Sequence, residues 1–367
     1  MSENFIVSAR KYRPTTFDSV VGQQHITVTL KNAILTGQLA QAFLFCGPRG
    51  VGKTTCARIL AKTINCTNLT ADTEPCNSCD SCRSFDDGTS MNIFELDAAS
   101  NNSVDDIRDL VRQVNIPPQT GRYKVYIIDE VHMLSTQAFN AFLKTLEEPP
   151  AYAKFILATT EKHKIIPTIL SRCQVFEFKR IQSEDIVGHL KTIAEKEGVH
   201  YEEEALHVIA HKSDGGLRDA LSTFDQLVSF TQGNLTRQRC NENLNLLDSE
   251  YYFRLVDHFQ KGEIPNALLL YQEIIAKGFD GQHFLTGLSE HLRNLMVSLD
   301  PATHKLLEVG EAFRGRFGEQ ATRCGLASLL QYLDISSDYE YRYKEAGNKR
   351  LFVEVALMKM AALVANP

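Results

Sequence analysis

Short apolar runs alternate with longer amphipathic stretches over the first half of the chain. Each run is bounded by polar residues, which is the pattern of a buried β-strand. The stretches between most of the runs are long enough for a helix that crosses over to the next strand. The pattern therefore predicts a mostly parallel sheet with helices on both faces. The predicted strands are residues 42–46, 92–96, 124–129, 154–160 and 174–178.

The pattern becomes helical after about residue 180. The stretch "SEDIVGHLKTIAEKEG" predicts a helix with Ser183 as its N-cap and Gly198 as its stop. From there to the C-terminus we find only helical patterns and no internal repeat. We expect an α/β domain at 1–180, a small helical domain at 181–240 and a larger helical domain at 241–367.

Composition fits an ordered, soluble protein of two or three domains. Of the 367 residues, 43% are hydrophobic and 23% are charged, and no low-complexity tract is present. The start, "MSENFIVSARKYRP", does not have the pattern of a signal peptide, and no apolar run approaches the ~20 residues that cross a bilayer. We expect a cytoplasmic protein without a membrane partner. The net charge of −6 argues against a generally basic surface but allows a local basic patch.

The stretch "GPRGVGKTT" has the spacing of a phosphate-binding loop. Gly47 is followed by four residues and then by Gly52, Lys53 and Thr54. Glycines let successive N–H groups point at phosphate oxygens, the lysine adds a positive charge, and the threonine hydroxyl can bind Mg²⁺. A predicted strand leads in, and a predicted helix begins just after it with its N-terminus toward the anion. The candidate nucleotide-binding residues are Gly47, Pro48, Arg49, Gly50, Val51, Gly52, Lys53, Thr54 and Thr55.

Two acids end the predicted strand "KVYIID". One interpretation is a solvent-facing acidic pair. The other gives Asp129 a role in holding Mg²⁺ and Glu130 the polarisation of an attacking water. The phosphate-binding loop upstream favours the second interpretation, because hydrolysis needs both parts. His132, close to Glu130, is interpreted as a packing residue.

Four of the nine cysteines are crowded into one short polar stretch, residues 66–82. Without a signal peptide they should be thiols or metal ligands. Close C-x-x-C spacing suits a single Zn²⁺ held by four sulfurs, an iron–sulfur cluster would also take four thiolates, and redox thiols are a further alternative. With four protein ligands no position is left for substrate, so we expect a structural module inserted before the next strand. Its ligands would be Cys66, Cys76, Cys79 and Cys82; buried or unreactive roles remain for Cys46, Cys56, Cys173, Cys240 and Cys324.

These motifs together resemble a known family. "ARKYRPTTFDSVVGQ", "GPRGVGKTT", "YIIDEVHMLSTQAFNAFLKTLEEPP", "FILATTEKHKIIPTILSRCQVFEFKRI" and "GGLRDALS" occur in the order and spacing of the gamma/tau subunits of the bacterial DNA polymerase III clamp loader, which are AAA+ ATPases. The resemblance is dense from about Ala9 to about Leu221 and weaker beyond. It implies an AAA+ core with a zinc module, a helical lid at 181–240 and a helical collar for oligomerisation at 241–367.

The resemblance assigns roles to three further polar residues. Thr160 matches the sensor-1 position, which touches the γ-phosphate or the attacking water. Arg172 matches the arginine finger that reaches the ATP of a neighbouring subunit, and Arg218 matches sensor 2, a cation that contacts phosphate from the lid. Without the family they would be an ordinary strand-end threonine and two surface arginines.

The resemblance also implies the ligands. Residues Tyr12, Pro14, Val21 and Gly22 match the segment that folds over adenine, so the cofactors would be ATP and Mg²⁺, with Zn²⁺ favoured at the cysteines. Phosphate contacts to DNA match positions Asn101, Asn102, Lys144 and Thr168. This sequence has amides where relatives carry basic residues in the "SNNS" turn, and Ser103 could instead be the N-cap of a helix.

The implied function is ATP-driven loading of the sliding clamp onto primed DNA during DNA replication. Partners would be the delta and delta-prime subunits, further gamma/tau copies, the clamp and primer-template DNA. The alternatives are another AAA+ DNA-remodelling ATPase, such as a Holliday-junction branch-migration helicase, and a non-hydrolysing scaffold like delta-prime. We exclude nucleotide polymerisation by this subunit, since no cluster of metal-binding acids accompanies the ATPase pair.

Overall fold

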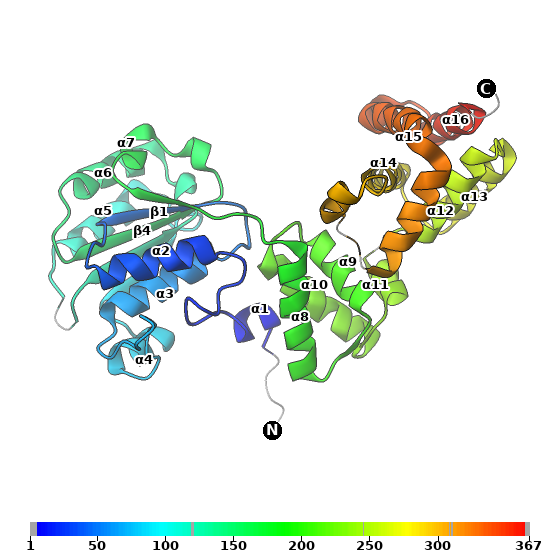
Figure 1. Ribbon diagram of the computed structural model, residues 1–367. Helices are drawn as coiled ribbons and strands as arrows, with labels where there is room; N and C mark the ends of the chain where they lie inside the picture. The colour runs from blue at the N-terminus through cyan, green and yellow to red at the C-terminus, as the bar shows by residue number, and fades with distance from the viewer. Residues whose placement is uncertain (1–5, 119–120, 245, 308, 310, 364–367) are drawn as a thin grey trace. The chain divides into compact units, whose positions relative to one another are not determined.

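A computed structural model describes residues 6–118, 121–244, 246–307, 309 and 311–363 (Figure 1). The described chain divides into two compact units. One reaches to residue 190 and includes 212–225; the other comprises 191–211 and the chain from residue 226 onward. The predicted domain boundaries stay predictions, and the outer ends of the first and last predicted domains, 1–5 and 364–367, lie outside the described residues.

The first unit is built on a five-stranded parallel sheet with strand order β2-β3-β4-β1-β5. All five predicted strands are confirmed, and their bounds differ from the prediction by at most one residue. β1 and β4 are buried along their whole length, as expected for inner strands of a sheet covered on both faces. The strands are β1 (Ala42–Cys46), β2 (Ile93–Asp97), β3 (Lys124–Asp129), β4 (Ala153–Thr159) and β5 (Gln174–Glu177).

Helices cover both faces of this sheet (Figure 1). Because side chains alternate along a strand, Phe43 and Phe45 of β1 pack on the side of α2 and α3, while Leu44 and Cys46 pack on the side of α5, α6 and α7. Burying a side chain such as Phe45 stabilises the fold by about 2–3 kcal/mol. The covering helices are α2 (Gln24–Leu35), α3 (Lys53–Asn65), α5 (Val104–Val114), α6 (Thr136–Glu147) and α7 (Pro167–Leu170).

Short elements connect these layers. They lie at the N-terminus, in the cysteine-rich stretch between α3 and β2, and after β3 and β4. The cysteine-rich stretch is thus inserted where the sequence predicted it. These elements are α1 (Ser8–Lys11), α4 (Asp80–Asp86), η1 (Val131–Met133) and η2 (Lys162–Lys164).

The predicted helix after residue 180 is confirmed as α8 (Ser183–Glu197). It starts at Ser183 itself, so Ser183 is the first helical residue rather than the residue before the helix. Gly198 follows the last turn with a φ of 68°, which a glycine adopts without strain and which ends the helix as predicted. The next helices are α9 (Glu203–Lys212), α10 (Leu217–Thr231) and α11 (Arg237–Asn243).

The expectation of only helical patterns beyond residue 180 is wrong in one detail. β6 (His200–Tyr201) and β7 (Asn234–Leu235) pair in parallel as a two-stranded sheet. Two residues are too few to produce an alternating pattern, so the sequence carries no signal for these strands.

The rest of the second unit is helical and has one large apolar core. Phe259, Tyr271, Phe284 and Tyr332 are among its largest buried side chains. Gly325 interrupts α15 with a φ of 72° and a ψ of 155°, values that a glycine allows. The elements are α12 (Ser249–Gln260), α13 (Ile264–Ala276), α14 (Gly281–Val297), η3 (Pro301–Leu306), α15 (Glu311–Arg342), η4 (Tyr343–Glu345) and α16 (Lys349–Ala362).

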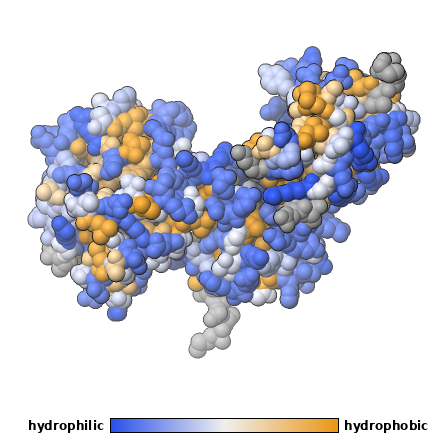
Figure 2. Space-filling view, viewed as in Figure 1, coloured by the Kyte–Doolittle hydropathy of each residue, from blue (hydrophilic) through white to orange (hydrophobic). Residues whose placement is uncertain are grey.

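The visible surfaces of both units mix hydrophilic residues with smaller hydrophobic patches (Figure 2). Within the described residues, every helix is too short or too polar to span a bilayer.

Candidate functional site

The carboxyl ends of β1, β3 and β4 meet at one edge of the sheet, where parallel strands commonly place ligand sites. The loop after β1 turns sharply at Gly47, whose N–H donates to the Thr159 carbonyl at 3.2 Å. Gly47 has a φ of 150°, and a Cβ at this position would lie 2.4 Å from the Phe178 carbonyl oxygen. Gly50 and Gly52 also have positive φ, 75° and 103°. Only glycine fits at position 47, because any Cβ there would overlap the Phe178 carbonyl oxygen. The sequence therefore determines the sharp turn after β1.

Lys53 closes this loop from inside. Its buried ammonium group donates to the carbonyl oxygens of Gly47 at 2.9 Å and Pro48 at 2.7 Å. Burial lowers the pKa of Lys53, and the carboxylates of Glu130 and Asp129 oppose that shift. A cation held this way is positioned for a phosphate at the N-terminus of α3.

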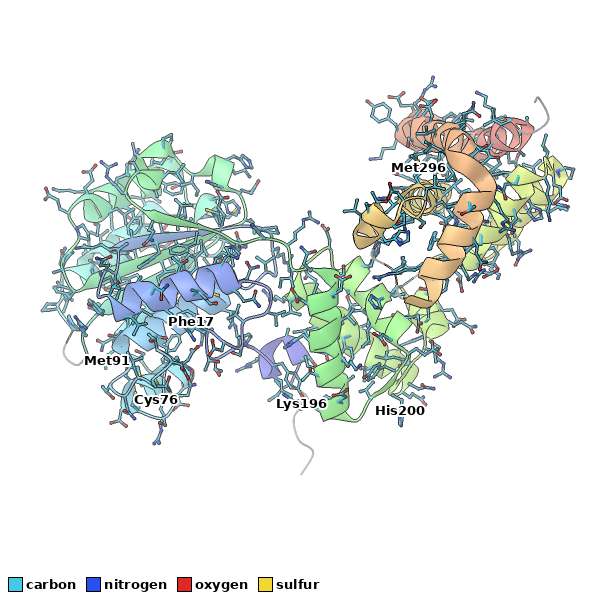
Figure 3. All side chains as sticks on the ribbon, viewed as in Figure 1. Phe17, Cys76, Met91, Lys196, His200 and Met296 are labelled. Carbon is cyan, nitrogen blue, oxygen red and sulfur yellow. The ribbon has the colours of Figure 1, made fainter. Side chains whose placement is uncertain are left out.

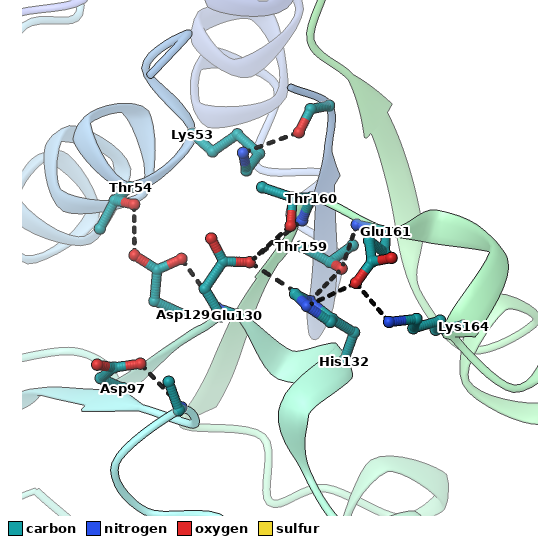
Figure 4. Close-up of polar contacts among 12 residues, drawn as sticks. Lys53, Thr54, Asp97, Asp129, Glu130, His132, Thr159, Thr160, Glu161 and Lys164 are labelled. Carbon is teal, nitrogen blue, oxygen red and sulfur yellow. Dashed lines mark hydrogen bonds and ion pairs between the residues drawn. The ribbon is translucent and has the colours of Figure 1, made fainter. Parts of the chain in front are cut away.

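Asp129 joins the loop to the end of β3 (Figure 4). The Thr54 hydroxyl donates to Asp129 Oδ2 at 2.6 Å, and the Glu130 N–H donates to Asp129 Oδ1 at 2.9 Å. A hydroxyl oxygen and a carboxylate oxygen in contact are ligands that Mg²⁺ prefers. The donor set at this point therefore fits a magnesium ion.

Glu130 has a strained backbone. Its φ of 46° and ψ of 44° lie in the left-handed region, which is uncommon for a residue with a side chain. Its carboxylate Oε2 accepts from the Thr160 hydroxyl at 3.0 Å and the Thr160 N–H at 3.3 Å. Thr160 directly follows β4, so neighbouring strands bring these two predicted residues together.

His132 lies on the other side of Glu130. Its side chain is 7% exposed, with Nδ1 at 3.1 Å from Thr159 Oγ1 and 3.3 Å from Glu130 Oε2. Its Nε2 lies 3.1 Å from Glu161 Oε2. The sequence predicted only a packing role for His132, whereas the structure gives it these polar contacts. Glu161 was not among the residues that the sequence predicted for the site. The available signals were a titratable residue two positions after Glu130 and an acid directly after Thr160.

The first turn of α10 reaches the loop as well. The Arg218 N–H donates to the Gly50 carbonyl at 3.3 Å, which brings this predicted residue next to the loop. From the N-terminal segment, Arg13 Nε donates to Thr55 Oγ1 at 3.3 Å. Arg13 lies between the predicted residues Tyr12 and Pro14 and was not singled out in the sequence.

The "VVGQ" segment is anchored to the end of β5. Val21 and Gly22 precede Gln23, which is fully buried and whose Nε2 donates to the Lys179 carbonyl at 2.7 Å. Gly22 has a φ of 70°, and a Cβ there would lie 2.9 Å from Ile181 Cγ2. This segment thus lies against the chain that leaves the sheet, and Gln23 is its structural anchor.

Arg172 makes a different set of contacts from the residues above. Its Nη2 pairs with Glu147 Oε1 at 2.7 Å and its Nη1 donates to the Thr168 carbonyl at 2.7 Å. The structure therefore places it with the ends of α6 and α7 instead of among the loop contacts.

The four predicted cysteines converge between α3 and α4 (Figure 3 labels Cys76). All four Sγ atoms lie within 4.8 Å of one another, with Cys66 Sγ at 3.5 Å from Cys76 Sγ and 3.9 Å from Cys79 Sγ. Four sulfurs at about 2.3 Å from one zinc ion would be about 3.8 Å apart, so this arrangement fits a single tetrahedral ion. Cys66, Cys76, Cys79 and Cys82 could hold that ion. All nine cysteines are free thiols, and Cys46 and Cys56 are buried, where burial raises the pKa of Cys46 to about 11 and that of Cys56 to about 12.

Comparisons with known proteins cover the same chain. Three family models match in succession: DNA polymerase III, delta subunit, at residues 22–182; DNA polymerase III clamp loader subunit, ATPase lid domain, at 185–233; and DNA polymerase III subunits gamma and tau domain III, at 235–367. The DNA polymerase III subunit tau of Bacillus subtilis strain 168 is 42% identical over 355 residues, which are 96% of this chain and 62% of that subunit. The DNA polymerase III subunit gamma of Buchnera aphidicola subsp. Baizongia pistaciae is 36% identical over 370 residues, with 99% of each chain covered. This chain belongs to the DNA polymerase III gamma/tau subunit family.

The family predicted from the motifs is thus confirmed, and so is the fold class, an α/β AAA+ unit followed by helical parts. A solved structure of the Thermotoga maritima RuvB Holliday junction branch migration motor is 20% identical, with a TM-score of 0.48, and covers 67% of this chain and 78% of that one. This gamma/tau chain spans 62% of the length of the Bacillus subtilis tau subunit.

The residues that family resemblance assigned to DNA lie on one helical layer of this gamma/tau chain. Asn101 and Asn102 precede α5, Lys144 is exposed on α6, and Thr168 is exposed on α7. The Asn101 side chain donates to the Asp97 carbonyl at 3.0 Å, which fixes the turn. The predicted N-cap is confirmed, because the hydroxyl of Ser103 accepts from the N–H of Asp106 at 3.2 Å while the Asp106 carboxylate accepts from the Ser103 N–H.

Proposed function

We propose that this chain is an ATPase that drives loading of the sliding clamp onto primed DNA, as the motor subunit of a DNA polymerase III clamp loader. The observation that supports this most directly is the meeting of Lys53, Thr54, Asp129 and Glu130 at one edge of the sheet. A chain that only served as a scaffold would not need both a complete phosphate loop and an acidic pair. Another AAA+ remodelling ATPase would share both features but does not account for the match of residues 235–367 to gamma and tau.

In this proposal the loop from Gly47 to Thr55 binds the ATP phosphates through backbone N–H groups, and Lys53 turns from its carbonyl partners to a phosphate oxygen. Thr54 and Asp129 hold Mg²⁺, which neutralises phosphate charge when bound. Tyr12, Pro14, Val21 and Gly22 contact the adenine, since apolar and backbone groups suit a purine.

Hydrolysis then depends on groups from two subunits. Glu130 polarises the attacking water and Thr160 orients it, while Arg218 contacts phosphate from the α10 turn. Arg172 acts on the ATP of the adjacent subunit. The position of Arg172 among the ends of α6 and α7 supports a role outside its own phosphate loop.

The cysteine cluster holds a structural zinc ion in this proposal. A single ion suits four sulfurs that all lie within 4.8 Å, whereas an iron–sulfur cluster distributes its thiolates over separate irons. Metal analysis of the purified chain should give one zinc ion per chain, and Cys76→Ser should reduce that content. Iron, or no metal at all, would contradict this assignment.

The partners follow from the family and are proposed with it. They are the delta and delta-prime subunits, further gamma/tau copies joined through the helical collar at 241–367, the sliding clamp, and primer-template DNA. Asn101, Asn102, Lys144 and Thr168 would contact DNA phosphates. Because only one of the four is basic, they would add little to the salt dependence of DNA affinity.

ATP turnover of the assembled loader tests the proposal. It should rise on addition of primed DNA and clamp, and Lys53→Ala should abolish that rise. Gly37→Ala, on an open turn away from the loop, is the matched control and should keep the stimulation. An assembly with Lys53→Ala that turns over ATP like the unmodified chain would overturn the proposed function.

A further inference from the structure

The environment of His132 carries an inference about how Glu130 acts. His132 is in η1, two residues after Glu130, and is nearly inaccessible to solvent. Its two ring nitrogens face groups from different strand ends: Nδ1 faces Glu130 and Thr159, and Nε2 faces Glu161 (Figure 4). Both nitrogens of this buried ring lie close to oxygen atoms. His132 therefore makes specific polar contacts and does not only fill space.

The far side of the ring is fixed from outside. Glu161 Oε2 lies 3.1 Å from Nε2 and accepts from Lys164 Nζ at 2.7 Å. This hydrogen bond from Lys164 lowers the pKa of Glu161, so the Glu161 carboxylate only accepts and Nε2 is the donor in this contact. The Thr159 oxygen, which takes the Glu161 N–H at 3.0 Å, fixes the Nδ1 side. The ring thus has one orientation.

The near side of the ring meets the Glu130 carboxylate at a single oxygen. Oε2 lies 3.3 Å from His132 Nδ1, and the same Oε2 accepts from the hydroxyl and N–H of Thr160. Because a carboxylate oxygen only accepts, Nδ1 holds Oε2 by donating its own N–H, so the ring donates from both nitrogens in this arrangement. These contacts fix the torsion of the carboxylate, and its second oxygen, Oε1, is turned away from them.

We propose that His132 is a positioning residue: together with Thr160 it holds Glu130 by Oε2, so that Oε1 is the atom that polarises the attacking water. This rests on the proposed function of Glu130. Glu161, paired with Lys164, holds the ring at Nε2 on the side opposite Glu130. This ion pair therefore also helps to position Glu130. Without the ring, Glu130 keeps only the Thr160 contacts at Oε2 and is held less firmly, which slows the chemical step without changing how ATP is bound.

The experiment uses the assembled loader with primed DNA and clamp. For His132→Ala we expect kcat to fall by about 10-fold or more, a part of the ~10²–10⁴-fold that a positioned general base supplies. The Kd of a non-hydrolysable ATP analogue should change by less than about 2-fold, because His132 has no role in binding phosphate. His200→Ala, an exposed histidine on β6 outside the proposed collar, is the control and should keep the kcat of the unmodified chain.

Two conservative variants separate positioning from folding. Asparagine places its amide where Nδ1 lies, and glutamine places its amide where Nε2 lies. His132→Asn should therefore recover more kcat than His132→Gln if the contact with Glu130 matters. The opposite order, or a kcat of His132→Ala within 2-fold of the unmodified chain, would overturn the inference.

Glu130→Gln distinguishes this inference from the proposed function. If Glu130→Gln turns over ATP normally, the assignment of Glu130 itself is wrong. If Glu130→Gln is inactive while His132→Ala is normal, only the positioning by His132 is wrong. Should the Tm of His132→Ala drop and nucleotide affinity fall together with kcat, His132 is a folding residue, and this inference also fails.

Discussion

Asp129 and Glu130 are consecutive residues, yet their side chains meet different partners. In an extended strand they would simply alternate between the two faces of the sheet. The left-handed backbone of Glu130 ends β3 at this point, so Asp129 meets Thr54 while Glu130 meets Thr160. Strain of this kind costs about 1–3 kcal/mol and persists where surrounding contacts enforce it. The contacts of His132 and Thr160 with Glu130 are such contacts.

Gly47 gives a prediction at the level of one atom. In Gly47→Ala the new Cβ would lie 2.4 Å from the Phe178 carbonyl oxygen, and a backbone atom cannot move aside as a side chain can. We expect nucleotide affinity to fall by 10-fold or more, and a loss of stability of roughly 2–4 kcal/mol from strain and overpacking. Calorimetric nucleotide titration and thermal unfolding would measure both.

The matched variant for that test is Gly37→Ala. Gly37 has a φ of 68°, and no atom lies within 4 Å of a Cβ there. It should lose only the ~1–2 kcal/mol of left-handed strain and keep nucleotide affinity. Equal effects of the two variants on nucleotide affinity would show that the approach to Phe178 is unimportant.

His291 gives a prediction about pH. It is buried in the helical core, where its Nε2 lies 3.2 Å from Gln320 Oε1. The charges of Arg316 and Asp257 also act on it. Burial lowers its pKa to about 4; the hydrogen bond with Gln320 opposes that shift without cancelling it. In the unfolded chain the pKa of His291 is about 6.5. Between about pH 6.5 and pH 4, His291 is therefore protonated in the unfolded chain and neutral in the folded chain. Stability from neutral His291 is present above about pH 6.5 and is lost as the pH falls toward 4.

The size of that loss is about 3 kcal/mol, from 1.36 kcal/mol for each pH unit. We expect the free energy of unfolding of the unmodified chain, minus that of His291→Gln, to shrink by about this amount between pH 7 and pH 4. Denaturant unfolding of both chains at several pH values would measure it. Parallel pH profiles of the two chains would contradict the prediction.

At the scale of elements, the local sequence pattern was enough to predict the five-stranded sheet but not the separate two-stranded sheet. β3 is an unbroken apolar run because both faces of the sheet are covered, and it was predicted to the residue. Ser103 as the N-cap of α5 was one of two interpretations of its turn, and the structure shows it as part of a capping box, which is a local interaction. β6 and β7 have two residues each, and their pairing depends on the fold around them.

The cysteine module is also attached to the N-terminal segment by a contact that sequence could not indicate. Glu74 is only 6% exposed. Its carboxylate accepts from the N–H groups of Phe17 at 2.7 Å and Asp18 at 3.0 Å, and it pairs with Lys31 at 2.7 Å. Figure 3 labels Phe17 and, in the cysteine module, Cys76. Glu74 thus connects the module to the segment that carries Tyr12 and Pro14.

Glu74→Ala should release this connection. Two backbone N–H groups would lose their acceptor, while the Lys31 ammonium would keep its second partner, Asp18, at 2.7 Å. Leaving a buried donor without an acceptor costs about 1–3 kcal/mol. We expect hydrogen exchange at Phe17 and Asp18 to accelerate by 10-fold or more, while the metal content stays unchanged. Asp72→Ala, exposed on the same loop, should alter neither. Unchanged exchange in Glu74→Ala would show that other contacts hold the segment.

At the scale of the molecule, the sequence predicted those parts of the site that are local motifs. The phosphate loop and the pair Asp129 and Glu130 are such parts. The contact of His132 with Glu161 requires the pairing of β3 with β4, which aligns Ile128 with Leu157 and so brings two loops 29 residues apart together. Only the three-dimensional register contains that information.

Arg172 is where the proposed assembly can be tested. Its guanidinium is held by Glu147 and the Thr168 carbonyl, at the ends of α6 and α7. If it acts on the neighbouring subunit's ATP, Arg172→Ala should bind nucleotide normally and lose DNA-stimulated turnover by roughly 10³-fold or more. Arg172→Lys should not restore it, because an ammonium group cannot reproduce the planar fork of a guanidinium.

Mixed assemblies make this prediction sharp. An Arg172→Ala subunit has an intact phosphate loop, and a Lys53→Ala subunit has an intact Arg172. Where the two are neighbours in the right order, one complete site forms across their interface. Assemblies that contain both Arg172→Ala and Lys53→Ala subunits should therefore regain part of the DNA-stimulated ATP turnover. Assemblies made with only one of the two variants should stay inactive. If the mixed assembly stays inactive although native mass spectrometry shows both subunits in one complex, Arg172 does not act between subunits.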